Sequence, residues 1–148
     1  MSAQEAPTIA RMHTAEHLLS AVMRRRFGSP RNLELHLGEK KTKCDFLVPR
    51  PLAAEDLALV EAEVNAEIAA GHSVTAEVVS RDEAERAYDL WKVPPDAAEI
   101  RIVRIGAVDA APCVGDHVRS TREVGRFRIT TADMKDERTV RIRFTLEP

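Results

Sequence analysis

The chain has 148 residues, of which 44% are hydrophobic and 31% are charged, and its formal net charge is −2. These values exclude an intrinsically disordered protein and predict one domain, 1–148, whose core is large enough to need no disulfides. The net charge excludes strong attraction of the whole molecule to nucleic acid, but it allows a local basic surface. The sequence contains no apolar signal segment and no run long enough to span a membrane, so we expect a cytoplasmic protein.

The first predicted element is an amphipathic helix over 14–27, in which apolar residues recur at helical spacing. Gly28 follows the last turn and is expected to end the helix. The apolar stripe of this helix centres on Val22, whereas His13 and His17 fall on the opposite side. We therefore expect these two histidines to face away from the apolar core.

Strands and helices follow without regular alternation. The predicted strands are 33–37, 43–48, 73–79, 99–106, 126–132 and 139–147, and the predicted helices are 53–71 and 80–88. Apolar and polar residues alternate strictly in 139–147, which is typical of an antiparallel sheet with one buried and one solvent-facing side. The pattern predicts an α+β fold in which helices pack on an antiparallel sheet in two layers.

Two short motifs contain residue types that bind metals. An H-x-x-x-H motif places His13 and His17 on one face of the first helix, and a C-x-x-x-H motif places Cys113 and His117 on a loop. Each spacing allows both side chains of the pair to reach one ion. Because imidazole and thiolate are preferred ligands of zinc, the four residues together predict a single zinc site.

Two other classes of zinc enzyme do not fit these motifs. The first motif also reads as the H-x-x-E-H of inverzincin peptidases, but these need a downstream glutamate ligand and a much larger domain. Zinc nucleobase deaminases need H-x-E and then P-C-x-x-C. Here Asp116 stands where the second cysteine of that motif would be. Neither class accounts for both pairs of ligands.

The two motifs and their flanks resemble the editing domain shared by alanyl- and threonyl-tRNA synthetases and by freestanding AlaX-type trans-editing proteins. HTAEHLL is similar to the first motif of this family, and CVGDHVRSTREVGRFRI is similar to its second metal motif and the segment after it. The likeness runs from about His13 to Leu146, and the short chain is similar to the smallest AlaX class. The resemblance implies the editing-domain fold and a hydrolase that removes serine, or glycine, from misacylated alanine tRNA in trans.

Three residues beside the metal motifs are candidates for catalysis or substrate sensing. The hydroxyl of Thr14 is a candidate sensor of the substrate side chain, and Glu16 is a candidate base or a support for a ligand. Asp116 is a candidate to orient a ligand imidazole. RNA phosphates are expected to bind arginines close to the two motifs, namely Arg24, Arg25, Arg26, Arg119, Arg122 and Arg126.

Two alternatives remain open at this point. The G-G-G-Q-P motif of larger family members is absent, Arg122 replaces a usual glycine, and Asp116 replaces a usual threonine. The same fold could therefore act on a different aminoacyl-tRNA or aminoacyl ester. The chain could instead be a non-catalytic RNA-binding module with structural zinc. Its oligomeric state, monomer or homodimer, is open as well.

Overall fold

The computed structural model describes residues 7–148. Its helices and strands, in chain order, are α1 (Thr8–Phe27), β1 (Asn32–His36), β2 (Thr42–Leu47), α2 (Ala54–Ala70), β3 (Val74–Ser80), α3 (Arg81–Ala87), β4 (Glu99–Ile105), β5 (Asp109–Pro112), the 3₁₀ helix η1 (Thr121–Val124), β6 (Arg126–Asp136) and β7 (Thr139–Glu147). Within this part of the chain, no helix combines the length and apolar character needed to cross a membrane.

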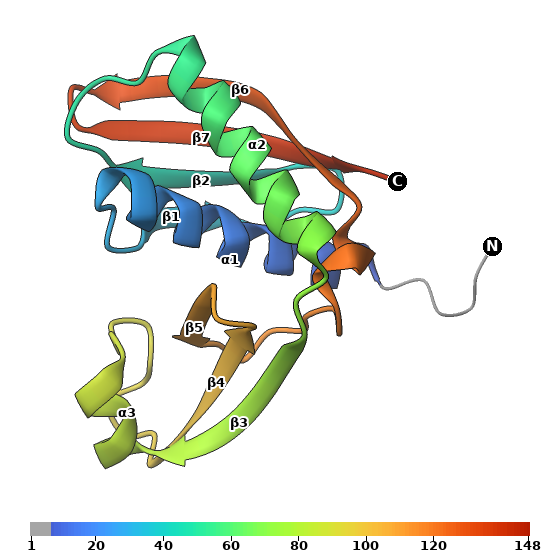
Figure 1. The fold of residues 1–148 in the computed structure, drawn as a ribbon. Helices are drawn as coiled ribbons and strands as arrows, with labels where there is room; N and C mark the ends of the chain where they lie inside the picture. Colours follow the sequence, from blue (N-terminus) through green and yellow to red (C-terminus); the bar gives the residue numbers. More distant parts are fainter. Residues whose placement is uncertain (1–6) are drawn as a thin grey trace.

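The strands form two antiparallel sheets. One has four strands in the order β1-β2-β7-β6, and the other has three in the order β3-β4-β5. Helices α1 and α2 pack on the four-stranded sheet, and α1 lies between that sheet and the three-stranded one (Figure 1). The predicted α+β class is confirmed, but the strands do not share one sheet. β3, β4 and β5 are consecutive in the chain and pair with one another, whereas β2 pairs with the C-terminal β7.

Helix α1 begins earlier than predicted, at Thr8 rather than at position 14. The added turns bury Ala10 and Met12, so tertiary packing stabilises a segment with little local helix signal. The predicted end is confirmed. Gly28 has φ 70°, and its N–H donates to the carbonyl of Arg24 (2.9 Å).

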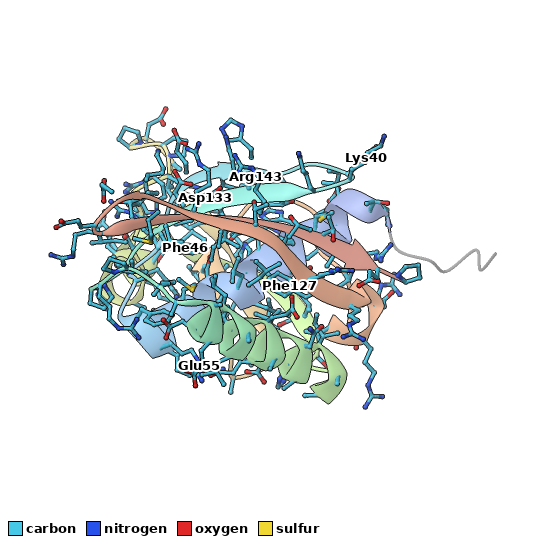
Figure 2. The ribbon with its side chains drawn as sticks, turned by 90° about the horizontal axis from the view of Figure 1, so that it is seen from above. Lys40, Phe46, Glu55, Phe127, Asp133 and Arg143 are labelled. Atoms are coloured by element: carbon cyan, nitrogen blue, oxygen red, sulfur yellow. The ribbon has the colours of Figure 1, made fainter. Side chains whose placement is uncertain are left out.

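The main core lies between α1, α2 and the four-stranded sheet. Its largest buried side chains include Phe46, Phe127 and Phe144, and the rings of the last two lie 4.8 Å apart (Phe46 and Phe127 are labelled in Figure 2). Ile105 of β4 belongs to the same cluster. The second sheet is therefore attached to the first through apolar contact as well as through the chain.

Strand β7 shows the predicted alternation. Val140, Ile142 and Phe144 are buried, whereas Arg141 and Arg143 lie on the other face of the sheet. Across that face, Arg143 donates to Asp133 of β6 (3.3 Å; Figure 2). The alternation of apolar and polar residues in this segment thus corresponds to a sheet with one buried face and one solvent-facing face.

Two short elements, β5 and η1, lie where a loop was predicted, and β6 continues to Asp136 rather than ending at position 132. β5 has four residues, the last of them Pro112, and it pairs only with β4. A strand this short has no alternation to detect, so only its pairing with a neighbour defines it.

The buried carboxylate of Asp45 in β2 forms ion pairs with side chains of the neighbouring strands. Asp45 has a side chain 2% exposed, and it accepts bonds from Arg141 Nε (2.9 Å) and Lys135 Nζ (3.1 Å). Burial by itself raises the pKa of Asp45, but the bonds from Arg141 and Lys135 outweigh it and lower the pKa from its usual 3.8.

This ion pair predicts a specific loss of stability in acid. Because the pKa of Asp45 is lower in the folded state, its contribution is complete above pH 3.8 and is lost as the pH falls through the folded-state pKa. Asp45→Asn should reduce the free energy of unfolding by about 2 kcal/mol at pH 7 and flatten its decline in acid, as measured by urea unfolding across pH. The control is Asp133→Asn, because Asp133 is 69% exposed and should change stability by less than about 0.5 kcal/mol. An equal effect of both variants would contradict the assignment.

Candidate metal centre

The structure brings the four predicted metal ligands together. One ligand atom from each of His13, His17, Cys113 and His117 lies within 4.8 Å of every other. The two histidines of the first motif are on α1, and Cys113 and His117 are on the loop after β5. His17 is buried and the other three are half-buried, so the cluster lies at the edge of the core within reach of solvent.

The spacing of these atoms fits a metal. Sγ of Cys113 lies 3.3 Å from Nε2 of His13 and 3.4 Å from Nε2 of His117. Neighbouring sulfur and nitrogen ligands of a tetrahedral zinc ion are separated by about 3.5 Å, as follows from Zn–S and Zn–N distances of about 2.3 and about 2.05 Å. Cys113 is therefore already at ligand spacing from His13 and His117, and all four ligand atoms lie within 4.8 Å of one another.

A buried aspartate fixes the orientation of His17. Nδ1 of His17 lies 3.2 Å from Oδ2 of Asp109, the first residue of β5. The other oxygen of Asp109 accepts from Arg24 Nη2 (2.9 Å), and the side chain of Asp109 is only 4% exposed. When Nδ1–H of His17 donates a hydrogen bond to this carboxylate, Nε2 of the same ring faces the cluster. Carboxylate–histidine–metal triads have this arrangement.

Thr14 performs the same task for His117. Thr14 is fully buried, and its hydroxyl lies 3.0 Å from the carbonyl oxygen of Ala10, 3.0 Å from Nδ1 of His117 and 3.2 Å from the N–H of Val118. A hydroxyl has one proton and two lone pairs. The hydroxyl of Thr14 donates its proton to the carbonyl of Ala10. Its two lone pairs then accept hydrogen bonds from the N–H of Val118 and from Nδ1–H of His117. In this arrangement the three bonds use the full hydrogen-bonding capacity of the Thr14 hydroxyl, and Nε2 of His117 faces Cys113.

The loop that carries Cys113 is held by β4. The N–H of Cys113 donates to the carbonyl of Arg101 (3.0 Å), and the guanidinium of Arg101 donates to the carbonyls of Cys113 and Gly115 (2.9 Å each). Gly115 is needed here because a Cβ at this position would overlap the ring of His13. With any other residue at this position, the ring of His13 would have to move.

The thiolate of Cys113 favours metal binding, whereas a protonated His17 competes with it. Partial burial alone raises the pKa of Cys113, but hydrogen bonds from His117, His13 and His17 lower it to about 3, so the sulfur is a thiolate, the form that binds metals. Burial alone lowers the pKa of His17, but its bonds to Asp109 and Cys113 raise it to about 10. Any metal that enters this site therefore displaces a proton from the cluster.

The remaining candidates lie apart from the four ligands. Glu16 is buried, and its carboxylate accepts from Ser20 (2.7 Å) and Asn32 (3.2 Å). Asp116 is exposed, and within residues 7–148 it makes no hydrogen bond to a ligand imidazole. Within the described residues, the side chains that hydrogen-bond to the rings of His17 and His117 are those of Asp109 and Thr14. Asp109 was missed, although a single carboxylate in the apolar run GAVDAAP, four positions before Cys113, was a detectable signal.

The six candidate arginines fall into two groups. Arg24 is bonded to Asp109, Arg25 and Arg26 pair with Glu63 of α2, and Arg122 donates to the carbonyl of Ala69 (3.4 Å). Arg119 and Arg126 are exposed, and their side chains have no hydrogen bond or ion pair within the described part of the chain. The guanidiniums of Arg119 and Arg126 could therefore bind phosphate groups without first breaking a bond within the described part of the chain.

The chain is similar in sequence to parts of known tRNA synthetases. Residues 100–143, which include the second metal motif, match the family described as the threonyl and alanyl tRNA synthetase second additional domain. Alanine–tRNA ligase of Methylacidiphilum infernorum is 37% identical over 125 residues, which cover 82% of this chain and 13% of the ligase. The chain is an alanyl- and threonyl-tRNA synthetase editing-domain-like protein.

The similarity extends to other alanine–tRNA ligases. That of Idiomarina loihiensis is 35% identical over 125 residues, which cover 83% of this chain and 14% of the ligase. That of Aeropyrum pernix is 30% identical over 141 residues, which cover 93% of this chain and 16% of the ligase. The latter match omits only 7% of 148 residues, or about ten, so it must span both metal motifs. The chain thus corresponds to a small part of each ligase.

Asp109 predicts a measurable effect on metal binding. Asp109→Ala removes the partner that orients His17 and should weaken zinc affinity about 10–100-fold, as measured by competition with a chelator. Asp116→Ala is the matched control, because this exposed carboxylate makes no hydrogen bond to a candidate ligand within residues 7–148, and it should change affinity less than about threefold. The assignment is wrong if the two variants weaken binding equally.

The hydrogen bond between Thr14 and His117 predicts different zinc affinities for two substitutions of Thr14. Thr14→Ser keeps the hydroxyl and should retain zinc affinity, whereas Thr14→Val keeps the shape and should weaken affinity about 10-fold by releasing His117. Both are measured with the same competition assay and checked by circular dichroism. If Thr14→Val binds zinc normally but loses discrimination between substrates, the hydroxyl senses substrate after all.

Proposed function

We propose that this chain is a zinc-dependent hydrolase that deacylates misacylated tRNA in trans, with serine, or glycine, on alanine tRNA as the substrate. Similarity to the editing-domain family supports a role related to tRNA editing. The observation that carries the hydrolase proposal is the meeting of His13, His17, Cys113 and His117 within 4.8 Å at a half-exposed position.

The side chains are arranged for such a reaction. When bound, zinc supplies a Lewis acid that polarises a carbonyl or lowers the pKa of a water. Asp109 and Thr14 hold the Nδ1 protons of His17 and His117, so that both rings keep a fixed direction. An aminoacyl ester is already activated, so hydrolysis needs little beyond a positioned water and stabilisation of the developing negative charge.

The exposed arginines support the choice of tRNA as partner. Arg119 follows His117 by two positions, and Arg126 begins β6 just beyond η1. These guanidiniums can accept phosphates without giving up an ion pair in the described structure. Arg25 and Arg26 would first have to leave Glu63. We expect weak, salt-dependent binding of tRNA, consistent with a net charge of −2.

Selection of serine over alanine requires a partner for the serine hydroxyl. A site built to bond a hydroxyl can reject the analogue that lacks it by about 10⁴–10⁵, since its own polar groups are then left unpaired. Thr14 already makes three bonds, so the candidate for this role is Asp116, an exposed carboxylate beside His117 that bound substrate would have to shield from water.

One observation favours a second candidate function. Four protein ligands complete a tetrahedron, as in structural zinc sites. On that basis the chain would be an RNA-binding module whose metal only maintains the fold. Chelation would then unfold the protein, whereas a hydrolase would lose activity first.

Release of labelled serine from alanine tRNA tests the proposal. The zinc-loaded chain, added to free Ser-tRNA for alanine, should release serine rapidly and spare the same tRNA carrying alanine. His17→Ala should reduce the rate by more than about 100-fold, because it removes a metal ligand rather than a residue that supports one. His36→Ala is the matched control, since His36 is exposed in β1 and should leave the rate unchanged.

Absence of serine release by chain with confirmed zinc would overturn the serine proposal. A panel of other misacylated tRNAs would then separate a different substrate from a binding module. Retained tRNA binding without hydrolysis of any member of the panel would favour the module.

A further inference from the structure

We infer that the four ligands are not equivalent and that His13 is the exchangeable one, the position at which an incoming substrate or water replaces a protein ligand. The inference deepens the proposed function, since a closed tetrahedron must open to act as a catalyst. It rests on how each ligand is held by the rest of the protein.

Two of the histidines are anchored by hydrogen bonds behind the ring. His17 is bonded through Nδ1 to Asp109, which is itself held by Arg24, and the side chains of His17 and Asp109 are 8% and 4% exposed. His117 is bonded through Nδ1 to the fully buried Thr14. Either ring can leave the cluster only if a buried polar group loses its partner, which is costly.

Cys113 is anchored through its backbone. Its N–H and its carbonyl both bond to Arg101 of β4, and the same guanidinium also holds the carbonyl of Gly115. The sulfur is therefore fixed by a loop that is attached to the three-stranded sheet. Three of the four ligands thus have independent attachments outside the cluster.

His13 has no such attachment. Within residues 7–148, no hydrogen bond is made by its Nδ1, and its only polar contact is from Nε2 to Sγ of Cys113 (3.3 Å). The ring is half-buried and stacks on His117, with centroids 4.3 Å apart and planes inclined by 27°. Its Nδ1–Cε1 edge faces the bare Cα of Gly115. A departing His13 leaves no polar group of the protein unpaired.

The position of Gly115 gives a second way to move His13. A methyl group at this position would overlap the edge of the His13 ring, while the carbonyl of Gly115 and its bond to Arg101 would remain. Gly115→Ala should therefore displace His13 and leave the other three ligands in place. It reproduces the loss of one ligand without removing a side chain.

The test compares zinc affinity among variants by competition with a chelator, using the full chain. His13→Ala and Gly115→Ala should weaken zinc binding by about 10-fold or less, whereas His17→Ala and His117→Ala should weaken it by more than about 100-fold. His36→Ala should have no effect. With cobalt in place of zinc, the thiolate–cobalt absorption band should persist in His13→Ala and Gly115→Ala, and the visible bands should report a changed geometry.

A loss for His13→Ala and Gly115→Ala that equals or exceeds that of the other two histidine variants overturns the inference. If His13→Ala does not fold, as judged by circular dichroism, Gly115→Ala decides the question. These readouts need no hydrolysis. A ligand hierarchy without serine release would therefore defeat only the proposed function, and serine release with four equivalent ligands would defeat only this inference.

Discussion

The attachment of α1 to the segment 109–118 is the constraint on which the site depends. Thr14 binds His117 and Val118 across the sequence separations of 103 and 104, and His17 binds Asp109 across 92. These contacts join the first helix to β5 and to the loop that follows it. Two of them, those made by His117 and His17, also involve a candidate ligand. The same bonds that hold the two parts of the molecule together therefore shape the cluster.

The four candidate ligands differ in how many hydrogen bonds hold them in place. Asp109, Thr14 and Arg101 surround His17, His117 and Cys113 with bonds from buried or strand-borne groups. His13 is half-buried and lies against Gly115, and within residues 7–148 no hydrogen bond holds the back of its ring. A catalytic metal needs fixed ligands to retain the ion and an accessible position to reach substrate. The hydrogen bonds around the four candidate ligands are thus unevenly distributed, as the inferred exchange of His13 requires.

Charge is organised locally rather than over the whole molecule. The net charge is −2. Arg25 and Arg26 of α1 form ion pairs with Glu63 of α2, which link the two helices. Arg119 and Arg126, close in sequence to the second metal motif, are exposed. Proximity in sequence to a metal ligand thus did not distinguish an arginine that supports the fold from one that is available to a phosphate.

The sequence alone determined the features that depend on local periodicity and residue type. Helical spacing identified α1 and α2, alternation identified β7 with its buried Val140, Ile142 and Phe144, and two ligand pairs identified the cluster. The division of the strands into two sheets depended on pairing between distant segments, which no local pattern reports. So did the roles of Thr14 and Asp109. A threonine on a helix and an aspartate in a short strand acquire their meaning only when the fold places each beside the Nδ1 of a particular histidine.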